Sequence, residues 1–167
     1  MSLVRRAAAY NADEKELCRL DEIYSAVKTP FEIRSGSEKV TRRFFKICNN
    51  GRESFTGLYK SLTEQGICKG HQCIAYGLYM RDNGIELSEG LAVYGYSICS
   101  AIVTNCVKLV PLSQLAGQKI LGESFELISS ASEKALFTDI NDIGISGAGF
   151  DPVSYTHLRA HETAANL

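Results

Sequence analysis

The chain has 167 residues, enough for one domain with a substantial apolar core. Hydrophobic residues make up 45% of it, charged residues 22%, and the net charge is −1, so the balance favours neither a nucleic acid nor an anionic membrane as a partner. No uninterrupted apolar run reaches about 18 residues, and no apolar signal segment follows the basic residues near the start, so we expect a cytoplasmic protein.

Apolar residues recur at spacings of three and four through most of the chain, which is the pattern of helices that bury one face. Pro30 and Pro111 interrupt this pattern, because the residue before a proline avoids the helical region. In chain order, the pattern predicts helices over about residues 11–27 (capped by Asn11), 32–48, 57–64, 71–81, 88–107 and 112–135.

The buried faces follow from the same spacing. In the predicted helices 32–48, 88–107 and 112–135, we expect the inward residues to be, in turn, Ile33, Val40, Phe44 and Ile47; then Leu91, Tyr94, Ile98, Ala101 and Ile102; then Ile120, Leu121, Leu127 and Ile128. The alternating pattern of a half-buried strand is missing. The predicted fold class is therefore all-α, an antiparallel helical bundle of about five to seven helices.

The last residues differ in character from the rest, and we interpret residues 1–151 as one helical domain and residues 152–167 as a non-native tail. The segment 153–163 matches what one reading frame of a common transposase sequencing adaptor encodes. The alternative is a metal-binding ending, because His157 and His161 lie four residues apart and would share a helix face. Eleven consecutive matching residues favour the adaptor.

A search for catalytic motifs finds no phosphate loop, dinucleotide fingerprint, metalloprotease helix or nucleophile elbow. The six cysteines contain no CxxC pair, and we expect reduced thiols. Cys68, His71 and Cys73 are a conceivable metal cluster or thiol nucleophile, but their spacing matches no common zinc motif. We therefore expect no catalytic residue and no metal site, with His71 a packed polar residue or the start of a helix.

The strongest pattern is Asn105 to Gln114 (NCVKLVPLSQ) followed by 117–121 (GQKIL). It resembles the hallmark of the urease accessory protein F family. Stretches at 20–34, 71–77 and 142–151 resemble further regions of that family in the same order. The family's first helices and its His-Glu-x-x-Tyr-x-Arg-Leu ending are missing, so we expect an N-terminally incomplete fragment without part of the partner-binding surface.

The resemblance implies an all-helical, dimeric and non-enzymatic urease accessory protein that acts as a nickel-insertion chaperone. Such a protein binds the accessory protein of the D/H type, the pair recruits the GTPase of the G type, and the assembly delivers nickel to apo-urease. Nickel is then the delivered ion, and we expect no stably bound cofactor, no nucleic acid and no membrane. The alternatives are a generic helical adaptor with another client and a thiol-dependent enzyme.

Two sets of candidate residues follow from the resemblance and from residue spacing. Gln114 and Gln118 lie four apart on one helix face, and Lys108 lies near the end of the preceding helix, where it also favours the helix dipole. We predict that Lys108, Gln114, Gln118, Arg34 and Glu32 contact partners, although Arg34 and Glu32 also suit a structural ion pair. The predicted structural residues are Pro111, Gly117, Gly95 and His71.

Overall fold

The computed structural model describes residues 7, 13–28, 30–48, 51 and 54–143, so Asn11, the ends of the predicted 1–151 domain and the predicted tail 152–167 lie outside the described residues. The described part is all-α, as predicted, with seven α-helices, one short 3-10 helix and no strand. The α-helices are α2 (Glu14–Val27), α3 (Phe31–Ile47), α4 (Phe55–Glu64), α5 (Gln72–Asp82), α6 (Leu87–Leu109), α7 (Gln114–Glu123) and α8 (Phe125–Phe137), and the 3-10 helix is η1 (Ile140–Asp142).

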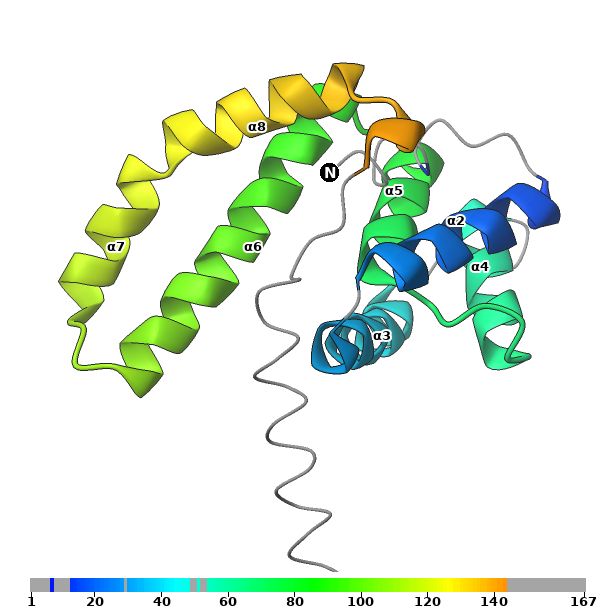
Figure 1. Cartoon of the computed structure of the whole chain (residues 1–167), viewed down its shortest axis with the longest axis horizontal. Coiled ribbons are helices and arrows are strands. Elements are labelled where there is room, and N and C mark those ends of the chain that lie inside the picture. The colour runs from blue at the N-terminus through cyan, green and yellow to red at the C-terminus, as the bar shows by residue number, and fades with distance from the viewer. Residues whose placement is uncertain (1–6, 8–12, 29, 49–50, 52–53, 144–167) are drawn as a thin grey trace, which may run out of the picture.

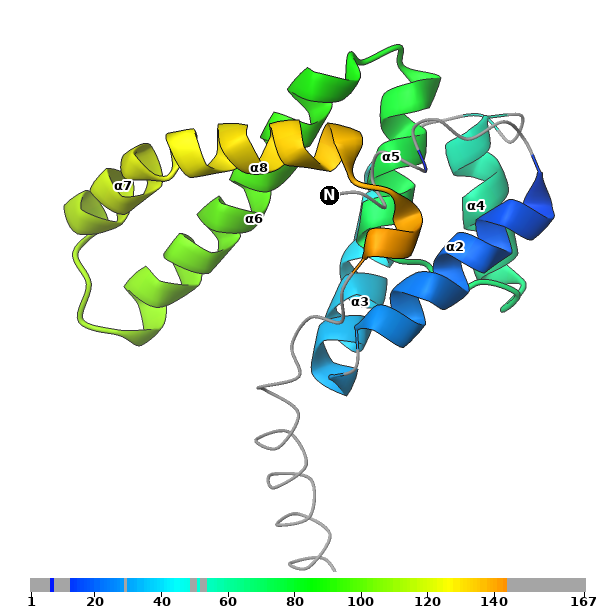
Figure 2. The same ribbon diagram turned by 45° about the horizontal axis from the view of Figure 1, so that its top comes forward.

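The helices form two groups that meet at α5 and α6 (Figure 1). Helices α2 to α5 form a compact cluster in which α5 packs against α3 and α4. Helix α6 leads away from this cluster, and α7 and α8 run back along it in the opposite direction, as Figure 2 shows from a second side. We call α6, α7 and α8 the arm.

The apolar core lies mainly within the cluster, around α5. Six of the 11 residues of that helix are buried and none is exposed, whereas α2 and α4 each bury one face. The shared contact is made by the fully buried side chains of Leu17, Leu20, Tyr59, Ile74 and Leu78. The cluster is therefore where fully buried side chains from distant segments of the chain pack together.

The start of α4 is fixed by the end of α5. The Asp82 carboxylate accepts hydrogen bonds from the backbone N–H groups of Phe55 at 3.0 Å and Thr56 at 2.9 Å. Ser54 adds a local cap, because its hydroxyl accepts from the N–H of Gly57 at 2.9 Å. These bonds satisfy three of the donors that a helix start leaves without intrahelical partners.

The helix predicted over 112–135 is wrong as a single element, because the structure divides it into α7 and α8 at Ser124. The Ser124 hydroxyl donates to the carbonyl of Ile120 at 2.8 Å. Its N–H lies 3.1 Å from that carbonyl and 3.2 Å from the carbonyl of Leu121. Back-bonding of this kind tightens and bends a helix, and the change in direction lets the α7–α8 pair curve along α6 (Figure 1).

Several residues that were predicted to point inward are exposed. Leu91, Tyr94, Leu121 and Ile128 are buried as expected, and Phe44 is partly buried against the core. The expectation was wrong for Ile33, Val40, Ile47, Ile98, Ala101, Ile102, Ile120 and Leu127, which are exposed. Helix α3 instead turns Ser37, Thr41 and Phe45 inward.

Helix α6 is long and apolar enough, by length and composition, to cross a membrane, and 22% of its most apolar 18-residue stretch is buried. It is the one helix among the described residues that meets this test. Helices that pack in the core of soluble proteins meet the same test, so a single example is weak evidence for a span.

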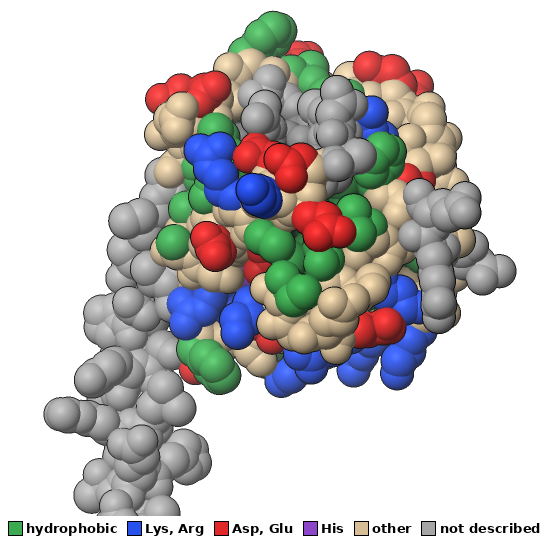
Figure 3. All heavy atoms as spheres, turned by 90° about the vertical axis from the view of Figure 1, so that its right-hand side faces the viewer, with side chains coloured by type: hydrophobic (Ala, Val, Ile, Leu, Met, Phe, Trp, Pro, Cys, Tyr) green, Lys and Arg blue, Asp and Glu red, His purple; other side chains and the backbone are tan. Residues whose placement is uncertain are grey.

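The charged surface is uneven. Lys39, Arg42, Arg43 and Lys46 are exposed on α3 at spacings that put them on neighbouring turns of one face. Figure 3 shows basic side chains gathered along the lower edge of the molecule, where Figure 1 places α3, with acidic side chains mostly above them. Arg42 is also 3.6 Å from Glu38, so part of this charge is balanced on the same helix.

Candidate functional site

The first candidate site is the turn between α6 and α7, around Pro111. Helix α6 ends at Leu109, and the N–H of Leu112 donates to the carbonyl of Val110 at 2.6 Å, which closes a three-residue turn around the proline. The Ser113 hydroxyl then caps α7 by accepting from the N–H of Ala116 at 3.1 Å. The chain therefore reverses within a few residues, and α7 packs against the last turns of α6.

Gly117 is the point of close approach between these two helices. A methyl group built on its Cα would lie 2.8 Å from Cγ2 of Val107 and 3.1 Å from Cγ1 of Val103. Both neighbours are β-branched, so their side chains have few alternative rotamers into which to move. The absence of a side chain at Gly117 is therefore what lets α7 approach α6 this closely.

A groove of about 320 Å³ lies beside this contact. We call it the turn groove, and its lining residues are Val103, Thr104, Val107, Lys108, Gln114, Gly117 and Gln118. It combines an apolar floor with one ammonium group and two carboxamides. Three of the predicted partner-contacting residues, Lys108, Gln114 and Gln118, are thus brought together in one place, beside the predicted structural residue Gly117.

The other two predicted partner residues lie elsewhere. Glu32 is exposed in the first turn of α3, and the guanidinium of Arg34 donates to the carbonyl of Lys28 at 2.7 Å. Arg34 therefore closes the connection between α2 and α3. Gly95 is buried and lines a separate apolar pocket of about 310 Å³ between α6 and α8.

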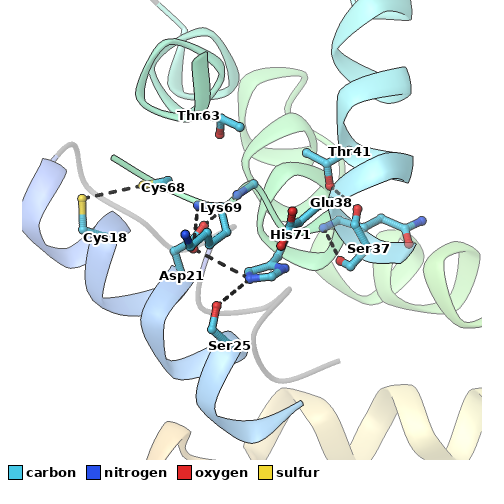
Figure 4. Close-up of polar contacts among 12 residues, drawn as sticks. Cys18, Asp21, Ser25, Ser37, Glu38, Thr41, Thr63, Cys68, Lys69 and His71 are labelled. Carbon is cyan, nitrogen blue, oxygen red and sulfur yellow. Dashed lines mark hydrogen bonds and ion pairs between the residues drawn. The ribbon is translucent and has the colours of Figure 1, made fainter. Parts of the chain in front are cut away.

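A second candidate site is a buried polar network centred on Asp21, which is 3% exposed (Figure 4). Its carboxylate accepts hydrogen bonds from the Tyr59 hydroxyl at 2.6 Å and from the backbone N–H groups of Lys69 and Gly70, both at 3.0 Å. The Tyr59 hydroxyl in turn accepts from the N–H of His71 at 2.7 Å. One side chain of α2 therefore holds α4 and the loop before α5.

His71 is the residue just before α5, at its N-cap position, and is fully buried. Its Nε2 lies 2.8 Å from the Ser25 hydroxyl, and its ring lies against that of Tyr24 with centroids 4.3 Å apart. Its Nδ1 has no hydrogen-bond partner within the described part of the chain. Burial lowers the pKa of His71, while the nearby Asp21 carboxylate opposes that shift.

Sequence reasoning did not identify Asp21, Tyr59 or Ser25 as parts of this network. A signal for Asp21 was present, because it lies on the same helix face as Leu17 and Leu20, where a carboxylate must find partners when the face is buried. No comparable local signal marks Tyr59, since its partners lie on α2 and in the loop before α5.

The thiols near this network are not activated as nucleophiles. Burial raises the pKa of the Cys73 thiol to about 12, and burial together with the Asp21 charge raises the pKa of Cys68. A reactive cysteine needs the opposite shift, toward the thiolate. The described residues also contain no group of three or more His, Cys, Asp and Glu side chains that could hold a metal ion.

The buried imidazole predicts a pH-dependent stability. The pKa of His71 in the folded chain lies below the ordinary value of 6.5, so the unfolded chain binds a proton more readily than the folded chain. The stabilisation is therefore complete above about pH 6.5. It falls as the pH drops from the unfolded-state pKa toward the folded-state pKa. Besides Asp21, the charged groups that act on His71 are Glu38, Arg34 and Lys69. Thermal unfolding should show a smaller loss of Tm on acidification for His71→Gln than for the parent chain.

The matched control is a variant in which the other two histidines, His157 and His161, become glutamine. This variant keeps the buried imidazole, so its Tm should depend on pH as that of the parent chain does. Identical pH profiles for the parent chain and His71→Gln would show that the imidazole does not contribute.

Comparisons with known proteins give a consistent result. A model of the family described as UreF matches residues 1–124. The chain is 25% identical over 138 residues to the urease accessory protein UreF of Streptococcus thermophilus, covering 82% of this chain and 58% of that protein. It is 29% identical to that of Paenarthrobacter aurescens (84% and 63%) and 30% identical to that of Actinobacillus pleuropneumoniae serotype 5b (90% and 66%). The chain thus spans about three fifths of the length of these relatives.

Proposed function

Because the chain belongs to the UreF family of urease accessory proteins, we propose that it acts as a non-catalytic scaffold in the maturation of the urease nickel centre. In this role it binds the accessory protein of the D/H type and, with it, the GTPase of the G type. Nickel is the cargo of the assembly and is delivered to apo-urease. The similarity to urease accessory proteins supports the urease accessory role, and the partners and the cargo are our proposal.

The observation that carries the proposal is the turn groove. Lys108, Gln114 and Gln118 lie at one end of the arm, beside the apolar side chains of Val103 and Val107. An apolar floor with a few polar groups at its edge is the usual composition of a protein-binding patch. A lysine and two glutamines offer hydrogen-bond donors and acceptors to a partner.

The arm also supports self-association, which we propose as a homodimer in the cytoplasm. Helices α6 and α8 expose large apolar side chains, among them Val93, Ile102, Leu127 and Phe137, each more than half exposed. Apolar surface of this extent is typical of interaction sites. Light scattering of the purified chain at several concentrations measures its oligomeric state directly.

The test of the proposal is co-purification of the chain with the D/H-type accessory protein and the G-type GTPase. Lys108→Glu reverses the one charge in the turn groove. We expect this change to weaken binding of the partners by about tenfold, or about 1.4 kcal/mol. Affinity is measured by titration of the labelled chain with the purified partners.

The control is Lys119→Glu, which reverses a lysine on α7 that is 77% exposed, pairs with Glu123 at 3.8 Å and does not line the turn groove. It should leave partner affinity unchanged. Equal losses for the two variants would indicate a general charge effect and would contradict a specific role for the turn groove. Failure of the parent chain to bind either partner would contradict the scaffold role itself.

A further inference from the structure

Two cysteines from distant parts of the sequence face each other at the edge of the cluster (Figure 4). The sulfur of Cys18 on α2 lies 3.7 Å from the sulfur of Cys68, which lies 50 residues further along the chain. A disulfide bond needs a sulfur–sulfur separation of about 2.05 Å, so the two sulfurs, now 3.7 Å apart, must move closer by less than the length of one such bond. The remaining four cysteines have no sulfur contact of this kind among the described residues.

The approach of these sulfurs is fixed by the surrounding backbone. The N–H of Cys68 donates to the carbonyl of Leu62 at 3.2 Å, which holds the residue at the end of the α4 turn. The next two N–H groups, of Lys69 and Gly70, donate to the Asp21 carboxylate on α2. Asp21 lies one helical turn after Cys18, so the network that positions the loop also places the two thiols together.

The two thiols differ in their surroundings. Cys18 is partly exposed, whereas Cys68 is 3% exposed. Burial and the Asp21 charge raise the pKa of Cys68, so this thiol stays protonated near neutral pH. A small reagent in solution can therefore reach Cys18 first, with Cys68 buried directly beside it.

We propose that Cys18 and Cys68 form a thiol–disulfide exchange site that reacts with low-molecular-weight disulfides of the glutathione class. The Cys18 thiol loses its proton to solvent and attacks one sulfur of the small disulfide, whose S–S bond breaks and releases one small thiol. The Cys68 sulfur then attacks the Cys18 sulfur as the proton of the Cys68 thiol passes to the departing small thiolate, which leaves as the second small thiol. The two protein thiols are oxidised to one disulfide, and the small disulfide is reduced to two thiols.

The bond joins α2 covalently to the loop that leads into α5. It closes a loop of about 50 residues, which restricts the unfolded chain far more than the folded one, because the folded chain already holds the sulfurs together. The oxidised protein is therefore more resistant to unfolding than the reduced protein, and a reducing agent reverses the change.

The experiment uses the full reduced chain and oxidised glutathione as the probe. After incubation, free thiols are blocked with N-ethylmaleimide, and the protein is digested with trypsin without a reductant. Cleavage after Lys15 and Arg19, and after Lys60 and Lys69, gives two short peptides that each contain one cysteine. We expect mass spectrometry to find peptide 16–19 linked to peptide 61–69, and a rise in Tm that dithiothreitol abolishes.

Two kinds of variant make the result specific. Cys18→Ser, and Cys18→Ala in case the serine disturbs packing, should lose both the linked peptide and the rise in Tm, while Cys99→Ser removes a partly exposed thiol on α6 and should keep both. A glutathione adduct that persists on Cys18 without the link would overturn the proposal. Disulfides that form only among Cys48, Cys99 and Cys106 would overturn it as well.

Discussion

Replacement of Asp21 by alanine is expected to lower the free energy of unfolding by about 4 kcal/mol. Three donors lose their acceptor at once, namely the Tyr59 hydroxyl and the N–H groups of Lys69 and Gly70. Each buried donor left unpaired costs about 1–3 kcal/mol, against a total stability of about 5–15 kcal/mol for a typical domain. Denaturant titration followed by circular dichroism measures the change, which corresponds to about 10 °C in Tm.

The matched control for this prediction is Asp139→Ala. Asp139 also accepts hydrogen bonds, from the N–H of Asn141 at 2.9 Å and from its side-chain amide at 2.8 Å, but these bonds are exposed at the start of η1. Water can replace the lost acceptor there, so the expected loss is below about 1 kcal/mol. Similar losses for the two variants would show that the network around Asp21 does not hold the cluster together.

The substitution Gly117→Leu is expected to separate α7 from α6 and to abolish the turn groove. A side chain at this position meets Val107 at 2.8 Å and Val103 at 3.1 Å at its first carbon atom. Overpacking of this kind costs about 1–3 kcal/mol. The added atoms also occupy the space beside Lys108 and Gln114, so we expect partner affinity to fall by more than about tenfold.

The control is Gly122→Leu on the same helix, which is expected to change stability in the opposite direction. A side chain at Gly122 meets no atom within 4 Å, so the substitution removes only the conformational freedom of glycine. Stability should rise by about 0.8 kcal/mol, with partner affinity unchanged. Thermal unfolding and partner titration of both variants give the comparison. A stabilised Gly117→Leu variant that binds normally would contradict the role assigned to the α6–α7 contact.

The presence of the helices could be predicted from the sequence, but not all of their buried faces. Periodic apolar residues show that a helix has a side suited to burial, and the predicted position of α5 is correct to within one residue at each end. Periodicity does not show what covers that side. On α3, Ile47 belongs to the predicted apolar face and is 81% exposed, because the helix buries Ser37, Thr41 and Phe45 instead.

The same distinction explains which candidate residues could be predicted. Lys108, Gln114 and Gln118 lie within a short segment that contains one proline, so local spacing and a tight turn are enough to bring them together. The Asp21 network draws on α2, α4 and the loop before α5. Its members become neighbours only through tertiary packing, which a single sequence does not reveal.

The Asp82 carboxylate makes the two helices α4 and α5 dependent on each other. Helix α4 begins with donors that are satisfied by the last residue of α5, which comes 26 and 27 positions later in the chain. The first turn of α4 therefore gains its full set of hydrogen bonds only after α5 has formed and returned to it. In physical terms, the two helices form and melt as one cooperative unit, so a change that frays the end of α5 also loosens the beginning of α4.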